Sequence, residues 1–497
     1  MTTQTQFDQL KTAGYNLIPV YRQRLADTET PLSVFARLKE HKQAYLFESV
    51  EGGENWARYS IIGLGESTVF SCNAGELTIQ QADGTIEKQP CTDPFQFIRD
   101  FQSQYKVPTQ ADLPALPSFT GGLVGYFGYD AVRYIEPRLN NAPEADPVGL
   151  PDIWMMLSKT VIVFDNLKDT LFLIVHADVV DADAYNQAQQ QLDALEDLLA
   201  TPISLKATPH TAPHFESLTG KAKFLESIAT VKEYIRAGDV MQVVPGHRMV
   251  SDFDGEPLQV YRALRHLNPS PYLFLVQGQT LENNQPFHIV GSSPEILSRL
   301  ENGIATVRPL AGTRPRGKTK EEDLALEQDL LSDEKEIAEH LMLIDLGRND
   351  VGRVSKIGKV QVTDQMVIER YSHVMHIVSN VQGEVRDDVD ALDVFKATFP
   401  AGTLSGAPKI RAMEIIDQVE PVKRGIFGGA VGYLGWHGEM DMSIAIRTCV
   451  IRENKVYVQA GAGLVYDSNP ESEWNETQIK ARAVIKAVEL SSNGLIL

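Results

Sequence analysis

The apolar positions of the chain fall into two patterns that predict antiparallel hairpins. From Ile153 to Phe164 the residues are mostly apolar and several are β-branched, and the polar sequence DNLKD separates this run from a second one, LFLIVHADVV. The same arrangement returns near the end of the chain, where RENK separates SIAIRTCVI from VYVQAGAG. Apolar runs on either side of turn residues are typical of two strands joined by a tight turn, so we expect a hairpin at each place.

A helical period follows the first hairpin. Within positions 181–200, four apolar side chains recur at steps of four, three and four residues among polar neighbours: Ala188, Leu192, Leu195 and Leu199. This spacing places the four side chains on one face of a helix. We therefore expect a helix in this segment.

The next segment predicts a domain boundary. TPISLKATPHTAPH, from Thr201 to His214, carries three prolines and no apolar period, which is typical of a linker. A chain of 497 residues is long enough for two cores, so we expect domains at residues 1–205 and 215–497. Because antiparallel hairpins occur in both halves beside separate helices, the predicted fold class is α+β, with antiparallel β-sheets and flanking helices, rather than a parallel doubly wound sheet.

Composition and charge narrow the function classes. The chain is 43% hydrophobic and 23% charged, as in soluble globular proteins. Its formal net charge of -20 argues against nucleic acid or an anionic membrane as the main partner. The apolar run Leu171–Val175 is far too short to span a bilayer, and the start, MTTQTQFDQL, predicts no signal peptide. The three cysteines have no metal-type spacing, so we expect free thiols and a cytoplasmic protein.

One motif suggests a nucleotide-binding loop. Residues Gly312–Thr319, GTRPRGKT, fit the phosphate-loop pattern G-x-x-x-x-G-K-[ST]. Pro315, however, removes a backbone N–H from the middle of the loop. Three acids, Glu321, Glu322 and Asp323, would occupy the first turn of the following helix and repel a phosphate. The expected antiparallel fold also lacks the βαβ unit that holds such a loop, so we reject a nucleotide hydrolase.

Two acidic pairs are candidates for a metal site. Glu336 and Glu339 are three residues apart in KEIAEHLMLIDLGRND, and Glu473 and Glu476 are three apart in NPESEWNET. On a helix such pairs share a face, and two pairs could frame one Mg²⁺ ion, which prefers oxygen ligands and retains several waters. Most pairs of this kind are solvated helix faces, and that alternative stays open from the residues alone.

Glycine-rich segments and one arginine suggest a ligand site near these pairs. AGTLSGAPK, GGAVGY and QAGAG allow the backbone to approach a ligand closely, although strand bends and tight turns also use glycine. Arg447 lies in the apolar run SIAIRTCVI, which we expect to form a strand. An unpaired guanidinium there would be costly, so either a protein carboxylate or a substrate carboxylate should pair with it.

Taken together, these segments resemble the chorismate-utilising enzymes, and within them the family of anthranilate synthase large subunits. The C-terminal half carries GDVMQVV, GSSPEIL, RPLAGTRPRG, DEKEIAEHLMLIDLGRND, TLSGAPKIRAMEII, GGAVGY and QAGAG. The N-terminal half carries YLFESVEGGENWARYSIIG and GGLVGYFGYD, which resemble the regulatory domain of those subunits. The resemblance implies the chorismate-binding enzyme fold, with a regulatory domain before the linker and a catalytic domain after it.

The resemblance also implies a substrate and a metal. Chorismate would be held through its carboxylates and Mg²⁺, with Glu339 and Glu476 as metal ligands and Glu336 and Glu473 in support. The residues that match the family's substrate-binding positions are Gly312, Thr313, Phe427, Arg447, Gly461, Ala462 and Gly463. Phe427 stands where the family often has tyrosine, so one hydrogen bond to the substrate is expected to be missing or replaced.

Two positions separate the reactions within the family. Isochorismate and salicylate synthases have a lysine base where this chain has Gln242, and an amide cannot deprotonate water, so ammonia is the expected nucleophile. Aminodeoxychorismate synthases often carry a lysine nucleophile where this chain has Ala311. Glu295 matches the acid that protonates the departing hydroxyl, which requires a raised pKa, and His376 and Thr403 match positions associated with later steps. The implied product is anthranilate, formed as pyruvate leaves.

The sequence also leaves two alternative functions open and predicts a partner subunit. An aminodeoxychorismate synthase component and a non-catalytic ligand-binding relative are the other interpretations that we considered. The chain has no G-x-C-x-G turn, so a separate glutamine amidotransferase subunit is expected to supply ammonia, in a heterotetramer of two large and two small subunits. Residues matching the family's tryptophan-binding elements predict feedback inhibition by tryptophan: Ser49, Pro271, Tyr272 and Leu273.

Overall fold

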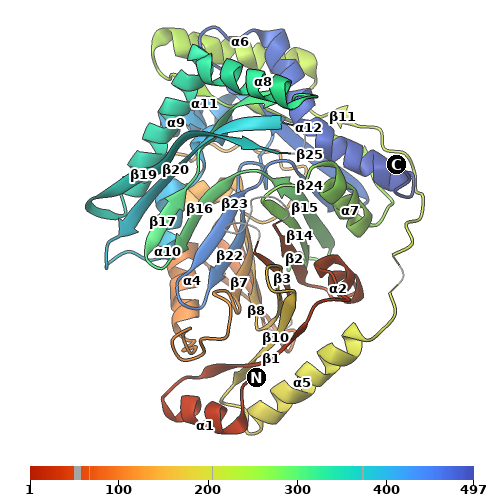
Figure 1. Ribbon diagram of the computed structural model, residues 1–497. Helices are drawn as coiled ribbons and strands as arrows, with labels where there is room; N and C mark the ends of the chain where they lie inside the picture. Colours follow the sequence, from red (N-terminus) through yellow and green to blue (C-terminus); the bar gives the residue numbers. More distant parts are fainter. Residues whose placement is uncertain (50–57, 66–67, 204, 372–373) are drawn as a thin grey trace.

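Two large antiparallel sheets form the centre of the molecule (Figure 1). The computed structural model describes residues 1–49, 58–65, 68–203, 205–371 and 374–497. The motif residues 50–57 and residue 204 of the linker therefore lie outside the described residues. Every pair of neighbouring strands within the described residues is antiparallel, as in the β1–β10 and β7–β8 pairs, which confirms the α+β prediction.

The first sheet has eleven strands. Their spatial order is β1 (Leu17–Leu25), β10 (Thr170–Asp178), β9 (Thr160–Asp165), β3 (Tyr59–Leu64), β2 (Ala44–Glu48), β14 (Tyr272–Gln279), β15 (Pro286–Ser293), β24 (Thr448–Arg452), β25 (Lys455–Gly461), β13 (Gly246–Asp252) and β11 (Glu216–Ser217).

The second sheet has twelve strands. Eleven follow in the order β18 (Leu310–Pro315), β20 (Val374–Val385), β17 (Ile304–Val307), β16 (Ile296–Glu301), β23 (Met440–Ile444), β22 (Ala430–Gly435), β7 (Gly122–Phe127), β8 (Ile153–Ser158), β4 (Val69–Asn73), β5 (Glu76–Gln80) and β6 (Ile86–Pro90). The twelfth, β19 (Ser355–Arg370), pairs with β20, and a separate two-stranded sheet joins β12 (Gln242–Val243) to β21 (Gly406–Ala407).

The two sheets pack against each other through large side chains. Trp154 of β8 is fully buried; its ring meets the ring of Phe287 on β15 edge to face, and its Nε1 donates to the carbonyl of Gln279 on β14. The Tyr45 hydroxyl of β2 lies 3.0 Å from the Ser158 hydroxyl of β8. These contacts join strands of different sheets, so the interface between the sheets forms one continuous apolar core.

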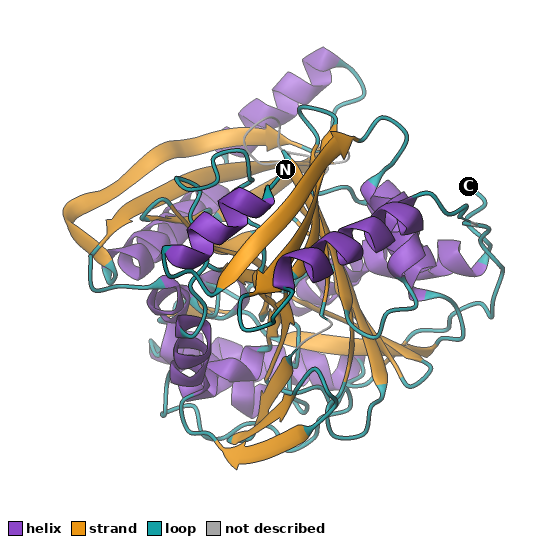
Figure 2. Cartoon of the chain, turned by 90° about the horizontal axis from the view of Figure 1, so that it is seen from below, coloured by secondary structure: helices purple, strands orange, loops and turns teal. Residues whose placement is uncertain are grey.

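Helices cover the outer faces of the sheets, as Figure 2 shows. The α-helices are α1 (Gln4–Thr12), α2 (Pro31–Leu38), α4 (Pro94–Ser103), α5 (Ala184–Leu199), α6 (Lys221–Ala237), α7 (Pro257–Leu267), α8 (Lys320–Ser332), α9 (Glu334–Gly352), α10 (Ala391–Thr398), α11 (Lys409–Val419) and α12 (Pro470–Ser492). Two short 3₁₀ helices are η1 (Tyr129–Tyr134) and η2 (Gly402–Leu404). The helices α5, α7 and α12 contact the first sheet, whereas α9 and α10 contact the second.

The predicted helix and both predicted turns are confirmed. In α5, Ala188, Leu192 and Leu195 are buried, and the helix packs on β10. Each buried leucine contributes roughly 1.5–3 kcal/mol through removal of apolar surface from water. The predicted hairpins are the pairs β9–β10 and β24–β25.

The first run of each predicted hairpin does not form a single strand, which corrects the prediction. The run Ile153–Phe164 divides at Lys159 into β8 of the second sheet and β9 of the first. The run SIAIRTCVI likewise divides between β23 and β24, which belong to different sheets. A run that serves two facing sheets must bend between them, so neither run forms a single strand.

Strands from both sides of the expected linker belong to the same two sheets. The described part of residues 201–214 has no helix or strand, and in Figure 1 the chain runs from α5 along one edge of the molecule toward α12. In the first sheet, however, β2 pairs with β14, and in the second β7 pairs with β22. Residues before and after the linker therefore share both sheets, and the division into 1–205 and 215–497 stays a prediction. No helix in the described chain is long and apolar enough to cross a membrane.

Candidate active site

One predicted acidic pair lies near the start of α9. The Asp333 side chain accepts from the backbone N–H groups of Lys335 and Glu336 and so begins the helix. Burial, together with the neighbouring carboxylate of Glu339, raises the pKa of Glu336. Glu339 also accepts a hydrogen bond of 3.1 Å from Nε2 of Gln242 on β12. The pair therefore shares a helix face, and it meets the residue predicted to select the nucleophile.

The second acidic pair lies near the start of α12, where Asn469 caps the helix. Glu473 is buried, its pKa is raised by burial, and its Oε2 has no hydrogen-bond partner among the described residues. Lys480 lies one turn beyond Glu476, and its Nζ is 2.6 Å from Oε1 of Glu476. The same ammonium donates to the carbonyl of Gly461 across 3.2 Å.

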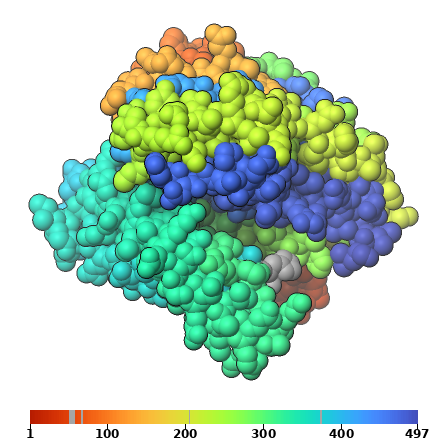
Figure 3. Space-filling view, turned by 90° about the horizontal axis from the view of Figure 1, so that it is seen from above, coloured from red at the N-terminus to blue at the C-terminus, as the bar shows by residue number. Residues whose placement is uncertain are grey.

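The two helices face each other across a hollow in the surface. Figure 3 shows this hollow between α12 in blue and the green to teal segment of α8 and α9. The positive charge of Lys335 on α9 lowers the pKa of Glu473 on α12, which is an effect of proximity. Among the described residues, no three His, Cys, Asp or Glu side chains lie close enough together to bind one metal ion.

The residues nevertheless fit a hard cation. Mg²⁺ needs only one or two carboxylates because water and substrate oxygens complete its shell. The orphaned Oε2 of Glu473 and the repulsion between Glu336 and Glu339 are both features that a nearby cation would relieve. The assignment of all four glutamates to Mg²⁺ remains a prediction.

Glu295 lies in the turn between β15 and β16. Its backbone N–H donates to the Ser293 hydroxyl across 3.3 Å, and its carbonyl accepts from the Ile444 N–H across 3.0 Å. The side chain is 6% exposed, and burial raises its pKa to about 7, although Thr403 and the charges of Arg447 and Lys480 act in the opposite direction. A carboxyl of this pKa is partly protonated at neutral pH and can donate a proton.

Arg447 lies between β23 and β24 rather than within a strand, which corrects the sequence expectation. Its φ of 50° falls in the left-handed region, where the chain turns from the second sheet to the first. Burial lowers the pKa of its guanidinium, while the charges of Glu295 and Glu476 raise it. Its side chain makes no hydrogen bond or ion pair with any other described residue. This half-buried cation is therefore available to an anionic ligand.

Gly312, Thr313 and His376 meet where β18 pairs with β20. Nδ1 of His376 lies 3.1 Å from the carbonyl of Gly312 and 2.9 Å from the Thr313 hydroxyl. Because a carbonyl only accepts, Nδ1 carries the proton; burial lowers the pKa of His376 to about 4, so the ring is neutral. Gly312 has a φ of 71°, and a Cβ there would lie 3.2 Å from Oε2 of Glu336. The backbone conformation therefore favours glycine, and the lack of a Cβ leaves room beside Glu336.

The predicted substrate-binding backbone of Gly461, Ala462 and Gly463 lies at the end of β25. Gly461 pairs with Gly246, and the N–H of the buried Ala462 donates to the carbonyl of Pro245. A Cβ on Gly463 would lie 2.9 Å from Nε2 of Gln242. Glycine at this position therefore leaves room for the amide that contacts Glu339.

Phe427 is placed differently from the other predicted substrate-binding residues. Its buried ring lies under the guanidinium of Arg424 and close to Gly246. No contact within the described chain joins this ring to Arg447 or Thr313. A role in binding substrate remains a prediction for Phe427.

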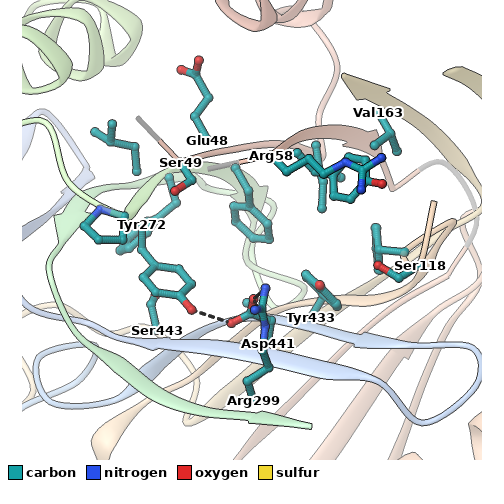
Figure 4. A pocket seen from close by; sticks show the side chains of 18 of the residues that line it. Glu48, Ser49, Arg58, Ser118, Val163, Tyr272, Arg299, Tyr433, Asp441 and Ser443 are labelled. Atoms are coloured by element: carbon teal, nitrogen blue, oxygen red, sulfur yellow. Dashed lines mark hydrogen bonds and ion pairs between the residues drawn. The ribbon is translucent and has the colours of Figure 1, made fainter. Parts of the chain in front are cut away.

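The four residues matched to a tryptophan site line one cavity between the sheets (Figure 4). The cavity has a volume of about 310 Å³, and its walls include Ser49, Pro271, Tyr272 and Leu273. The Tyr272 hydroxyl donates to Asp441 across 2.8 Å, and Arg299 forms an ion pair with the same carboxylate across 3.0 Å. The structure brings these residues together; their ligand remains a prediction.

The sequence did not predict some residues of the candidate active site and of the cavity between the sheets. Lys480 contacts Glu476 and Gly461, and its position four residues after Glu476 was a signal that could have indicated it. Asp441 and Arg299 line the cavity between the sheets, but they lie in apolar strands with no local pattern that points to a ligand.

The rejected phosphate loop is filled by the protein's own carboxylate. Asp323 accepts from the Gly317 N–H across 2.9 Å and from the Arg316 guanidinium across 2.7 Å. The preceding strand β18 pairs antiparallel with β20, not within a βαβ unit. Both observations agree with the argument that excluded a nucleotide.

The sequence matches the family described as chorismate binding enzyme over residues 42–486. The chain belongs to this family. Among curated proteins, anthranilate synthase component 1 of Acinetobacter calcoaceticus is 88% identical over 497 residues, which is 100% of both chains. The protein of the same description from Pseudomonas aeruginosa is 53% identical and covers 99% of each chain.

Solved structures of the chorismate-binding enzyme family agree with this assignment. Anthranilate synthase component I from Streptococcus pneumoniae has a TM-score of 0.75 and 36% identity, with 93% of this chain and 99% of that chain covered. MenF, the menaquinone-specific isochorismate synthase from Escherichia coli, has a TM-score of 0.68 at 18% identity, with 97% and 98% covered. The second likeness supports the fold alone. The chain is therefore a chorismate-utilising enzyme whose similarity to anthranilate synthase component 1 spans its whole length.

Proposed function

We propose that the chain is the chorismate-binding component of anthranilate synthase, the enzyme that makes anthranilate for tryptophan biosynthesis. The observation that carries the proposal is the meeting of Glu295, Arg447 and Glu476. A proton-donating carboxyl, an uncommitted guanidinium and a carboxylate on the facing helix act on one another there. This is the set of groups that a dianionic substrate with a leaving hydroxyl requires.

The substrate is bound through its two carboxylates. Arg447 pairs with one of them, and the backbone of Gly461–Gly463 and the Thr313 hydroxyl lie beside it. Glu339 and Glu476, with Glu336 and Glu473 in support, would hold Mg²⁺, which when bound would supply positive charge to neutralise and orient the ring carboxylate. Lys480 holds Glu476 in place through its ion pair.

The chain's own groups then move protons. Glu295, protonated because it is buried, gives its proton to the hydroxyl on carbon 4 as the C–O bond breaks, while ammonia forms a bond to carbon 2. Gln242 cannot deprotonate water, so water does not compete as the nucleophile. In the second stage the neutral His376 accepts, at Nε2, the proton that leaves carbon 2 as pyruvate is eliminated. Thr403 lies beside Glu295 and supports its carboxyl.

A second component supplies the ammonia. The relatives' description as component 1 implies another component, and the glutamine-hydrolysing reaction needs a cysteine nucleophile that this chain does not place in a suitable turn. We infer a glutamine amidotransferase subunit, two copies of each chain in the assembly, and a cytoplasmic location.

Tryptophan is the proposed ligand of the cavity between the sheets. Its indole needs an apolar slot with a few polar anchors, and the cavity combines Pro271, Leu273 and aromatic rings with Ser49 and the Asp441 carboxylate. Strands β16 and β23 both contribute residues to the wall of this cavity. Strand β16 begins directly after Glu295, and strand β23 ends close to Arg447. A ligand that shifts these strands would change the active site, which is what allosteric inhibition requires.

A product assay tests the proposal. The purified chain is incubated with chorismate, Mg²⁺ and an ammonium salt, and the products are separated by chromatography. Anthranilate is expected, identified by its fluorescence. Aminodeoxychorismate as the end product would instead assign the chain to the sibling reaction, and unchanged chorismate would leave only a binding role.

A further inference from the structure

A narrow cavity adjoins Glu295 and opens beside α9. It has a volume of about 50 Å³ and is bounded by α9 on one side and by the segment Ala401–Thr403 on the other. A water molecule needs roughly 10–15 Å³ of such space. The cavity therefore has room for a few water molecules, and it is far too small for chorismate.

The α9 wall of this cavity continues the face that carries the acidic pair. Leu343, Leu346, Gly347 and Asp350 follow Glu339 by four, seven, eight and eleven residues, and all four line the cavity. Residues with this spacing share one face of a helix. The cavity thus begins where the active site ends and leads away along the same helix.

The two ends of the cavity differ in exposure. At the inner end, Glu295 is buried, and Thr403 lies beside its carboxyl. At the outer end, Leu346 and Gly347 are partly exposed. Asp350 also lies in the wall, 6% exposed and joined to the Lys409 ammonium across 2.8 Å. The lining of the cavity therefore includes polar groups besides the buried acid.

The proposed reaction needs such a route. In each turnover Glu295 loses its proton to the hydroxyl on carbon 4, the C–O bond breaks, and one water molecule forms beside a carboxylate. Before the next turnover the water must leave and Glu295 must regain a proton. The ammonia nitrogen releases one proton as it becomes the amine of anthranilate, so reprotonation of Glu295 by exchange with solvent leaves the overall reaction balanced. We infer that the cavity between α9 and Ala401–Thr403 is the passage through which this water leaves and the proton returns, an inference that rests on the proposed function.

Leu346 offers a way to close the passage. Its Cδ2 lies 1.8 Å from the point where a Cβ on Gly402 would be, so the two residues touch across the mouth. In Leu346→Phe the larger ring has no room toward Gly402 and must extend into the passage. Gly402→Ala pushes the flexible tip of Leu346 in the same direction. Leu341→Phe is the matched control, because Leu341 is 44% exposed and lies about 140° away around the same helix.

Rapid-mixing kinetics with saturating chorismate, Mg²⁺ and ammonia tests the inference. At a pH of about 6, below the pKa of Glu295, most of the enzyme starts the first turnover with this carboxyl protonated, so both passage variants should form about one anthranilate per enzyme at the wild-type rate. Later turnovers should be at least tenfold slower, giving a burst, while the KM for chorismate stays unchanged. The control variant should match the wild type in both phases.

Equal slowing of the first and later turnovers would overturn the inference, and so would no slowing at all. A raised KM for ammonia with an unchanged maximal rate would also overturn it and make the passage the entry for ammonia. Absence of anthranilate from the wild type would instead refute the proposed function.

Discussion

Gln242 and Glu339 lie 97 residues apart in the sequence and are joined by a hydrogen bond of 3.1 Å from the amide Nε2 to the carboxylate Oε1. Because a carboxylate only accepts, the NH₂ group of the amide faces Glu339 and the amide oxygen is left for another donor. The residue predicted to select the nucleophile is thus positioned by a residue predicted to bind Mg²⁺. Ammonia, which carries N–H donors, suits that amide oxygen.

The first prediction concerns the metal ligands. Glu339→Gln and Glu476→Gln each remove one anionic oxygen from a hard-cation site, so anthranilate formation at millimolar Mg²⁺ should fall at least ~100-fold. The amide of Glu339→Gln can still accept from Gln242, so the thermal unfolding midpoint should stay near that of the wild type. Near-normal activity of either variant would show that these carboxylates do not bind the metal. Glu334→Gln, an acid in the first turn of α9, is the control and should remain active.

A second prediction follows from the buried acid. Because burial raises the pKa of Glu295 to about 7, its protonated fraction is nearly complete at pH 5 and small at pH 9. The value of kcat/KM for chorismate, measured at a constant concentration of free ammonia, should therefore fall as pH rises through about 7. Glu295→Gln should be slower by a factor of at least ~100 and should lose this limb of the profile. A limb that persists in the variant would assign the titration to another group.

Burial of Glu295 also has a cost in stability. The raised pKa means that the folded state binds the proton more tightly than the unfolded state, so the free energy of unfolding falls as pH rises from about 4.5 through 7. At pH 8 Glu295→Gln should therefore be more stable than the wild type, by up to ~3 kcal/mol. The advantage should vanish near pH 4, where both chains are neutral at this position. Chemical denaturation at the two pH values measures it, and an equal difference at both would contradict the explanation.

Arg447 should determine affinity for the substrate. Its guanidinium makes no hydrogen bond or ion pair with another described residue, so Arg447→Gln should fold normally. Loss of a charge-assisted bond worth roughly 1.5–3 kcal/mol should raise the KM for chorismate ~10–100-fold. Steady-state kinetics with varied chorismate measures the change. An unchanged KM would mean that the guanidinium pairs with no part of the substrate.

Tryptophan should inhibit the wild type by binding the cavity between the sheets. In Ser49→Phe the aromatic ring would fill part of that space of about 310 Å³, so inhibition should be relieved while activity without tryptophan is kept. Ser103→Phe, at an exposed serine near the end of α4, is the matched control and should remain sensitive. Titration of all three proteins with tryptophan during turnover decides the matter. Insensitivity of the wild type, or equal inhibition of Ser49→Phe, would exclude this cavity.

Local features of the fold could be predicted from the sequence, but long-range ones could not. The helix α5 and the turns of β9–β10 and β24–β25 depend on neighbouring residues, so their periodicity and turn chemistry are visible in the chain. The bends at Lys159 and Arg447 exist because each run serves two sheets, and no local pattern states which distant strand will be the partner. For the same reason the pairing of β2 with β14 was not predicted.

The candidate site shows the same limit. The glutamates on α9 and α12 were predicted from their spacing and from resemblance, and the structure places both pairs on helices facing one hollow. Lys480 and the cavity residues Arg299 and Asp441 emerged only from the structure, because their partners lie in distant segments. The closeness of Gly312 to Glu336 likewise emerged only from the structure, because a separate helix brings the carboxylate there.

Isotopic labelling tests the central claim most directly, namely that this chain aminates chorismate with free ammonia and depends on another subunit for glutamine. The purified chain is given chorismate, Mg²⁺, ¹⁵N-ammonium and unlabelled glutamine, and the anthranilate is analysed by mass spectrometry. The account predicts anthranilate that is one mass unit heavier throughout, and no product when ammonium is omitted. Unlabelled anthranilate formed from glutamine by the chain alone, or no anthranilate from ammonium, would contradict the account.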